Sequence, residues 1–190
     1  MSDILTIKKE KMCDNLHSFA KSCSEILVDL NERIVFAESC TGGMIASSMA
    51  GVPGISNYLC GSFVTYRADS KRKWLGVKKS TISSFTTESF ETAQEMAIGA
   101  LEKTPEADWS LSIVGHFGPD APEEKDGIIW VCVARRSRKG KIKIKMVAES
   151  KLAPNGRLQR QKNAAETAFT FLSRTLLVKS QKESVRKQSA

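Results

Sequence analysis

The sequence predicts a single α/β domain of three α/β/α layers, with a mixed, mostly parallel sheet and a C-terminal β-hairpin. Segments with the apolar spacing of helices alternate with short apolar segments typical of buried strands, which is the pattern of α/β folds. The 190 residues contain no linker-like stretch, and 41% of them are hydrophobic and 26% charged. Length and composition therefore favour one domain and exclude intrinsic disorder of the whole chain.

The first half of the chain predicts alternating helices and strands. Apolar side chains recur every three or four positions in 10–30, as on the inner face of a helix. The apolar segment 33–38 is typical of a short buried strand. The small-residue segment 44–50 predicts a helix after a glycine turn, and the aromatic and β-branched segment 58–66 predicts a second strand. A short helix is expected over 70–75.

The second half predicts a helix, a strand, a hairpin and a last helix. Ser89, or Thr87 before it, suits the cap of a helix that runs to about Lys103. The segment 109–114 predicts a third strand, and the apolar spacing in 158–178 predicts the last helix.

The predicted hairpin joins strands 128–134 and 141–147. In its second strand lysines alternate with apolar residues, which is typical of a strand with one solvated face. Lysines on an edge strand also discourage pairing with other chains. The alternating positions are Lys141, Ile142, Lys143, Ile144, Lys145 and Met146.

The net charge of +8 is concentrated in the run 135–145 and in the basic stretch 179–190. Neither stretch has interleaved aromatic residues or a nucleic-acid motif, so nucleic acid is a disfavoured partner. We predict a flexible N-terminus over 1–9, one domain over 10–178 and a flexible basic tail over 179–190.

Several classes of protein are disfavoured by simple absences in the sequence. No apolar run approaches the roughly 20 residues of a membrane-spanning helix, and the first residues lack the apolar core of a secretory signal. Five spread cysteines without a CxxC pair favour reduced thiols and no metal site. We therefore expect a cytoplasmic protein without metal or membrane partner.

The segment 38–43 (ESCTGG) joins the first predicted strand to a helix. Its glycines let the backbone approach a ligand, and amides at a helix N-terminus can bind phosphate or an oxyanion. A capped turn without a ligand explains the same residues, and Glu38 either orients the turn or simply ends the strand. The segment is not a Walker loop, because no GKS or GKT follows.

Four motifs give the chain a resemblance to a known family. They are AESCTGG (37–43), GSFVTYRADSKRKWLGV (61–77), MAIGAL (96–101) and G-x-x-G-P-D (115–120). Together they resemble the CinA C-terminal domain family over roughly 15–177. The resemblance implies a stand-alone amidohydrolase that deamidates nicotinamide mononucleotide to nicotinate mononucleotide and ammonia.

By this resemblance Ser39 is the nucleophile and Lys71, the lysine of the TY-x4-K motif, is its base in a Ser/Lys dyad that forms an acyl-enzyme. A lysine can act so when burial or nearby positive charge, as from Arg72 and Lys73, lowers its pKa. The family implies no cofactor, a pyridine nucleotide as partner and a homodimer. The substrate-binding residues that it implies are Cys40, Thr41, Gly42, Gly43, Tyr66, Gly115, Gly118 and Arg157.

The chain departs from the family where the substrate is shaped. His116 and Phe117 replace small or aliphatic residues after the third strand, and Phe117 could fill substrate space, while His116 is either a ligand contact or structural. The family's GAVS motif becomes 86–89 (TTES), and Gln161 stands where a second arginine is expected. A weakly active or inactive nucleotide-binding module with altered specificity is therefore the alternative prediction.

Overall fold

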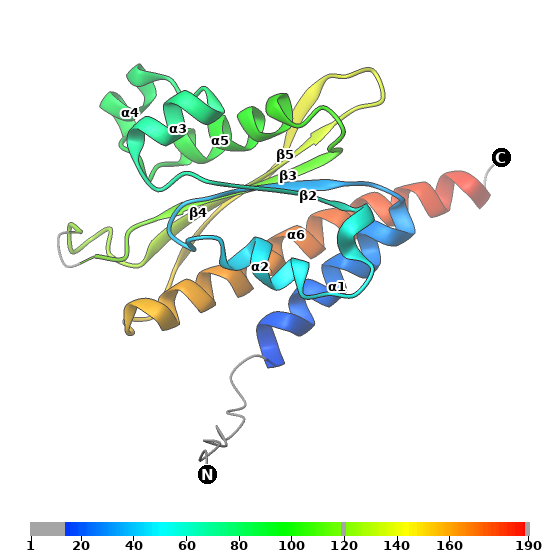
Figure 1. Ribbon diagram of the computed structural model, residues 1–190, viewed down its shortest axis with the longest axis horizontal. Helices are drawn as coiled ribbons and strands as arrows, with labels where there is room; N and C mark the ends of the chain where they lie inside the picture. Colours follow the sequence, from blue (N-terminus) through cyan, green and yellow to red (C-terminus); the bar gives the residue numbers. More distant parts are fainter. Residues whose placement is uncertain (1–13, 119–120, 189–190) are drawn as a thin grey trace, which may run out of the picture.

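The computed structural model describes residues 14–118 and 121–188, so the predicted flexible segment 1–9 lies outside the described residues. Figure 1 shows a central sheet between two layers of helices, the three-layer arrangement that the sequence predicts. In chain order the elements are α1 (Asp14–Leu30), β1 (Ile34–Glu38), α2 (Met44–Ala50), the 3-10 helix η1 (Ile55–Asn57), β2 (Leu59–Val64), α3 (Ala68–Leu75), α4 (Lys79–Phe85), α5 (Phe90–Lys103), β3 (Trp109–Gly115), β4 (Ile128–Arg136), β5 (Ile142–Lys151) and α6 (Arg157–Gln188).

Across the described residues the sheet has five strands in the order β2-β1-β3-β4-β5. β1 is parallel to β2 and β3, whereas β4 is antiparallel to β3 and β5. The mixed sheet and the hairpin of β4 and β5 are thus confirmed. Four of these strands run in the same direction, so the prediction of a mostly parallel sheet is correct for strand direction. It is not correct for strand pairing, because two pairs are parallel and two are antiparallel.

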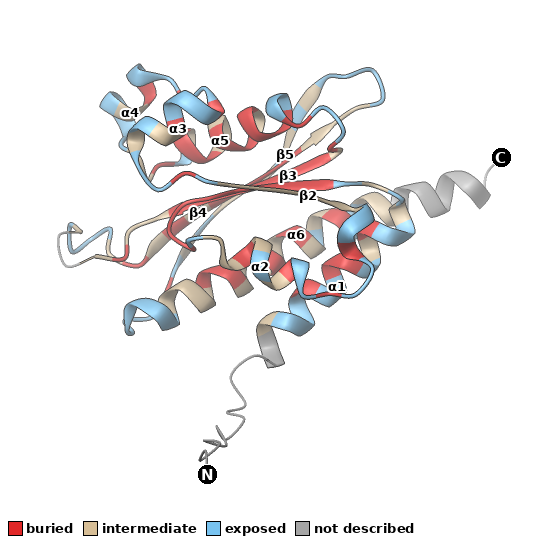
Figure 2. Cartoon of the chain, viewed as in Figure 1, coloured by how far each residue is buried: buried red, intermediate tan, exposed pale blue. Residues whose placement is uncertain are grey.

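Each face of the sheet has its own hydrophobic core. α1, α2 and α6 cover one face, where Phe36, Leu111 and Phe169 are buried. α3, α4 and α5 cover the other, where Val35 and Met96 are buried. Neighbouring residues of β1 enter opposite cores because side chains alternate along a strand. Figure 2 shows the buried residues gathered in the sheet and on the inward faces of the helices.

The elements agree with the predicted ones apart from two short helices, α4 and η1, that were not predicted, and from β5 and α6, which extend beyond their predicted ends. α4 is not predicted by the sequence, since among its seven residues Thr81 alone is buried. α6 continues past the predicted end at Val178 to Gln188, so the helix includes most of the segment predicted as the tail. None of the helices among the described residues has the length and apolar character needed to cross a membrane.

The connections bring the carboxyl ends of β1, β2 and β3 to one edge of the sheet. From β1 the chain passes along α2 on one face to reach β2, then crosses the other face through α3, α4 and α5 to β3. The strand order therefore changes direction at β1, and ligands of open α/β sheets bind at such a point. Ser39 follows β1 directly at this edge.

Candidate active site

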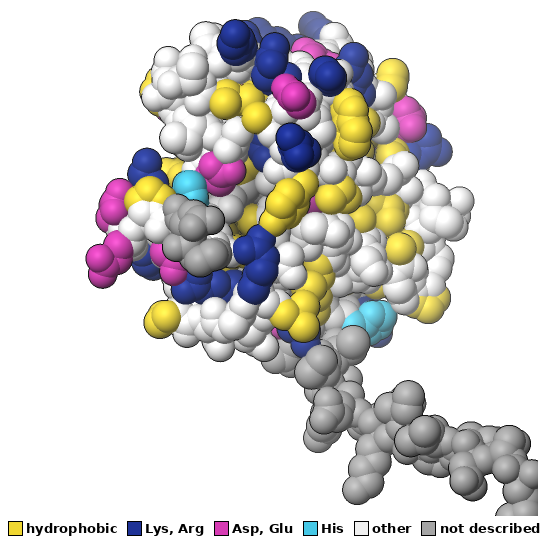
Figure 3. All heavy atoms as spheres, turned by 60° about the vertical axis from the view of Figure 1, so that its left-hand side comes forward, with side chains coloured by type: hydrophobic (Ala, Val, Ile, Leu, Met, Phe, Trp, Pro, Cys, Tyr) yellow, Lys and Arg dark blue, Asp and Glu magenta, His cyan; other side chains and the backbone are white. Residues whose placement is uncertain are grey.

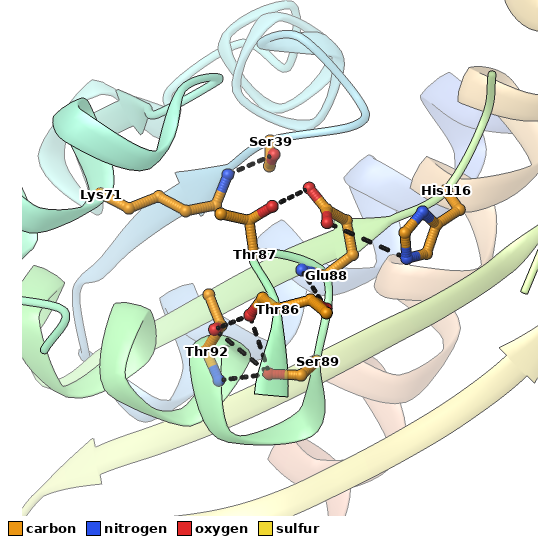
Figure 4. Close-up of polar contacts among 8 residues, drawn as sticks. All are labelled: Ser39, Lys71, Thr86, Thr87, Glu88, Ser89, Thr92 and His116. Atoms are coloured by element: carbon orange, nitrogen blue, oxygen red, sulfur yellow. Dashed lines mark hydrogen bonds and ion pairs between the residues drawn. The ribbon is translucent and has the colours of Figure 1, made fainter. Parts of the chain in front are cut away.

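Ser39 and Lys71 meet at the carboxyl edge of the sheet. Lys71 Nζ donates a hydrogen bond to Ser39 Oγ at 2.9 Å and a second to the carbonyl oxygen of Thr65, also at 2.9 Å (Figure 4). Ser39 is 5% exposed and Lys71 is fully buried. The structure thus brings the two residues of the predicted dyad into direct contact, and the Thr65 carbonyl fixes the direction of the amine.

Burial lowers the pKa of Lys71 from its ordinary value of 10.5, because a buried ammonium ion loses its hydration. The negative charge of Glu88 acts in the opposite direction and raises the pKa of Lys71. Arg72 and Lys73, which the sequence offered as the source of positive charge, are exposed side chains. Desolvation is therefore the main cause of the lowered pKa of Lys71.

Glu38 is fully buried and organises the turn that carries Ser39. Its carboxylate accepts hydrogen bonds from the amides of Ile45 and Ala46, at 3.0 and 2.9 Å, and from the hydroxyls of Thr41 and Ser62, at 2.8 and 3.1 Å. Of the two predicted roles, Glu38 has the orienting one. It also occupies the first free amides of α2, so this helix N-terminus does not offer those amides to a ligand anion.

The Cys40–Gly43 turn presents other amides. The amide of Gly42 donates to the Ser39 carbonyl, and Gly42 and Gly43 have positive φ angles of 62° and 97°, which favour glycine. The amides of Thr41 and Gly43 donate no hydrogen bond to another described residue. These two amides, in the turn that follows Ser39, are the candidates for binding an oxyanion.

The side chains of Cys40 and Thr41 are buried. The Cys40 thiol is buried, and burial raises its pKa to about 12, which makes it a poor nucleophile beside Ser39. The Thr41 hydroxyl is used by Glu38. Gln161 of α6 donates to the Cys40 carbonyl at 3.1 Å and so ties the turn to the last helix. The predicted contribution of Cys40 and Thr41 is therefore limited to their backbone.

Tyr66 follows Thr65, whose carbonyl contacts Lys71, and we call Tyr66 and its partner Arg157 the rim of the site. Arg157, the first residue of α6, donates to the Tyr66 hydroxyl and to the carbonyl of Phe117. Both predicted substrate-binding side chains are exposed. Phe117 belongs to the hydrophobic core beneath α6, so the ring packs inside the fold rather than filling substrate space.

The two glycines predicted after β3 differ in what they touch. A side chain at Gly115 would lie 2.7 Å from Ile129 and 2.8 Å from the carbonyl of Ile128, so this glycine allows β4 to pack closely. Packing thus explains Gly115 without any substrate. Gly118 lies in the following loop, where its carbonyl accepts from Ala121, and makes no described contact with the dyad.

A second polar group lies beside the dyad, in the segment between α4 and α5. The Glu88 carboxylate accepts from the Thr87 hydroxyl at 2.5 Å and lies 3.9 Å from Nε2 of His116. Figure 4 shows this carboxylate and the Thr87 hydroxyl on the side of the Ser39–Lys71 pair. Nε2 of His116 is buried and has no hydrogen-bond partner among the described residues, and its proximity to Glu88 is a feature that the sequence did not predict.

Three contributors were missed: the Thr65 carbonyl, Glu88 and Gln161. Thr65 lies in the TY-x4-K motif, six residues before Lys71, whereas Gln161 contacts the distant Cys40 through tertiary structure. Glu88 had one available signal, its position just before the Ser89 cap at a point where the family pattern differs. No group of three or more His, Cys, Asp or Glu side chains that could hold a metal ion occurs among the residues that the structure describes.

The face that contains this edge of the sheet has mixed surface chemistry. Figure 3 shows basic, acidic and hydrophobic side chains intermingled over it, without a continuous patch of one charge. Recognition at this face therefore depends on individual groups rather than on a broad electrostatic field.

Comparisons with known proteins agree with this architecture. The sequence profile described as the CinA C-terminal domain matches residues 16–176. A CinA-like protein of Endomicrobium trichonymphae is 34% identical over 173 residues, which cover 87% of this chain and 39% of that relative. A CinA-like protein of Petrotoga mobilis is 43% identical over 108 residues, or 56% of this chain and 27% of the relative. The chain spans less than half the length of these relatives.

Solved structures share the fold over their whole length. The competence/damage inducible protein CihA from Agrobacterium tumefaciens superposes with a TM-score of 0.77 at 29% identity, over 85% of this chain and 95% of its own. The CinA superfamily protein KP700603 from Klebsiella pneumoniae has the same TM-score at 25% identity, over 86% of this chain and 99% of its own.

Proposed function

The chain belongs to the CinA C-terminal domain family, and on that premise we propose that it is a serine amidohydrolase that deamidates nicotinamide mononucleotide. The observation that carries the proposal is the 2.9 Å hydrogen bond between a buried, fixed Lys71 amine and the Ser39 hydroxyl. A serine hydroxyl becomes a competent nucleophile when a neighbouring base can take its proton, and a lysine with a lowered pKa is such a base.

In the first half of the reaction Ser39 Oγ attacks the carboxamide carbon while its proton moves to Lys71 Nζ. The tetrahedral oxyanion accepts hydrogen bonds from free amides of the Cys40–Gly43 turn. Lys71 then gives the proton to the amide nitrogen, the carbon–nitrogen bond breaks, and ammonia leaves an ester on Ser39.

In the second half water replaces the serine. Lys71 takes a proton from water as the oxygen attacks the ester carbon, and returns it to Ser39 Oγ as the carbon–oxygen bond to the enzyme breaks. The products are the carboxylate of nicotinate mononucleotide and a proton, and Ser39 is regenerated. Neither half uses a cofactor or metal.

Arg157 and Tyr66 supply polar groups at the rim where the rest of a nucleotide would extend. The arginine carries a fixed positive charge and a planar set of donors that suit a phosphate. Its contacts with Tyr66 and the Phe117 carbonyl hold the side chain at the rim. We assign these two residues to orientation of the substrate rather than to the chemistry.

The experiment is ammonia release from nicotinamide mononucleotide by the purified chain and by Ser39→Ala and Lys71→Ala. We expect release by the wild type and loss of at least a thousandfold in both variants. Ser47→Ala and Lys73→Ala, which change exposed residues of α2 and α3, are the matched controls and should retain activity.

No release from a folded wild-type protein would contradict the deamidase proposal. Saturable binding of the nucleotide without release of ammonia would instead support the alternative prediction, an inactive nucleotide-binding module. By the same resemblance we propose a homodimer, and a monomeric mass in light scattering would contradict it.

A further inference from the structure

The Glu88 carboxylate lies beside the dyad, bonded to one neighbouring group and close to a second. The Thr87 hydroxyl donates to one carboxylate oxygen at 2.5 Å, and His116 Nε2 lies 3.9 Å from the other. The side chains of Glu88 and His116 are 24% and 17% exposed, so the pair is largely removed from water. Figure 4 shows the carboxylate between His116 and the Ser39–Lys71 contact.

A purely structural explanation exists for Glu88. It stands next to Ser89, whose hydroxyl caps α5, and a carboxylate near a helix N-terminus is stabilised by the helix dipole. That explanation leaves two features without a reason: the orientation of the carboxylate toward the dyad and the approach of His116. It also predicts no effect of Glu88 on the pKa of Lys71, so a role of Glu88 at the dyad can be distinguished from it by experiment.

We propose that Glu88 is a positioning residue of the dyad, whose carboxylate supplies the negative charge against which Lys71 becomes an ammonium ion when it takes the proton of Ser39. The inference rests on the role of Lys71 in the proposed function. A neutral buried amine accepts a proton readily only if the new charge is compensated nearby. The Thr65 carbonyl offers a dipole, and Glu88 offers a full charge.

The other groups around Glu88 are few. Lys71 of α3 and Cys40 of the turn both lie within its electrostatic influence, and His116 faces it from the end of β3. The cavity beside Glu88 has a volume of about 400 Å³ and is also lined by Glu91, Lys125 and Glu149. A separate cavity of about 420 Å³ lies in another part of the fold. Burial lowers the pKa of Lys71, and Glu88 and then Cys40 raise it.

The test measures the charge of Lys71 directly. In the full chain with isotopically labelled lysine, the pKa of Lys71 is obtained from its side-chain NMR signal, which Lys71→Met assigns. Glu88→Gln keeps the shape and removes the charge, and we expect it to lower the pKa of Lys71 by about one unit. Thr87→Val, which frees the carboxylate from its donor, should shift it in the same direction by less.

Glu91→Gln is the matched control, since it makes the same change in the first turn of α5 and on the same cavity. It should leave the pKa of Lys71 unchanged. A wild-type pKa of Lys71 in Glu88→Gln, or an equal shift in Glu91→Gln, would overturn the proposal. Circular dichroism establishes that each variant is folded before it is compared.

Activity provides a separate measurement. In Glu88→Gln the acidic limb of the kcat/KM profile should move to lower pH, and kcat on its plateau should fall about tenfold because the ammonium is less well compensated. A shifted pKa of Lys71 without ammonia release by the wild type would support this inference while contradicting the deamidase proposal. Ammonia release with an unshifted pKa would contradict the inference alone.

Discussion

At the residue scale, Glu38 carries more of the local structure than its place at the end of a strand suggests. One buried carboxylate satisfies two amides of α2 and two hydroxyls from separate segments. Glu38→Gln replaces one acceptor oxygen by an NH2 group that would face donors. We expect the free energy of unfolding to fall by about 3 kcal/mol, because hydrogen bonds to a charge are lost and buried donors remain unpaired.

Urea unfolding at neutral pH measures this change. Glu25→Gln on the exposed side of α1 is the control, since its carboxylate is 64% exposed and its loss should change stability little. Equal stability of the two variants would show that the turn does not depend on the Glu38 carboxylate.

Lys71 predicts a pH dependence of stability. Its pKa is lower in the folded chain than the ordinary 10.5, so between these two values the unfolded chain binds more protons than the folded one. The free energy of unfolding should therefore rise with pH across this window and level off above 10.5. Lys71→Met removes the titrating group and should remove that rise.

The measurement is urea unfolding at several pH values from 7 to 10, as a difference between wild type and variant. Lys73→Met, two positions along α3 and exposed, should keep the wild-type slope. An unchanged slope in Lys71→Met would mean that other groups cause the pH dependence.

The residues of the candidate site differ in how far the sequence could predict them. Ser39 and Lys71 were found because each lies in a motif, and a motif records chemistry that local sequence carries. Gln161 contacts Cys40, and Glu88 lies near His116, across segments far apart in the chain, and no local pattern encodes such contacts. The Thr65 carbonyl differs, because it lies only six residues before Lys71 in the same motif. The resemblance also implied Gly115 as a substrate contact, whereas its proximity to β4 gives it a packing role.

At the scale of elements, the position of Lys71 depends on how closely α3 approaches α5. A side chain at Gly99 of α5 would lie 1.9 Å from the carbonyl of Leu75, the last residue of α3. Gly99→Ala must therefore push α3 outward. We expect a loss of about 1–3 kcal/mol in stability from the overpacking, and reduced ammonia release because Lys71 moves with its helix.

Gly156→Ala is the control for this change, since nothing lies within 4 Å of the added carbon. Unfolding midpoints and ammonia release are measured for both variants. Wild-type activity in a destabilised Gly99→Ala would show that α3 can shift without moving the amine away from Ser39.

Elements with a strong apolar pattern were predicted well, and those that depend on tertiary contacts were not. α2 matches its predicted residues because a glycine turn and a run of small residues define it. α4 has no apolar stripe, and it is anchored by Glu95 of α5, which accepts from the Lys78 amide and the Thr81 hydroxyl. α6 extends beyond its predicted end because neither glycine nor proline follows Val178 to stop it.

At the scale of the whole molecule, the basic run and the candidate site lie at opposite ends of the strands of the sheet. β4 starts beside the end of β3, where Ile129 pairs with Gly115, and ends beside its start, where Arg135 pairs with Trp109. The basic turn after β4 is therefore remote from Ser39. The charge of this run consequently does not explain recognition of an anionic substrate at the dyad.

The two hydrophobic cores share one sheet, and this predicts that they unfold together. β1 and β3 contribute alternate side chains to both faces, so neither core can lose its packing without exposing the strands that support the other. Trp109 packs in the core beneath α1 and α6, and Trp130 packs against the core beneath α5. Two variants, Trp109→Phe and Trp130→Phe, separate these reporters, with Trp74 replaced by Phe in both.

Leu172→Ala tests the coupling, because it removes a fully buried side chain of α6 on one face only. The expected loss of about 2–5 kcal/mol should lower the urea midpoint reported by Trp109 and by Trp130 equally. Leu177→Ala, which changes an exposed residue of the same helix, should leave both midpoints near the wild-type value. Separate transitions for the two tryptophans would show that each face of the sheet folds as its own unit. In that case one hydrophobic core alone would stabilise the position of Ser39, which lies at the end of β1 between the two cores.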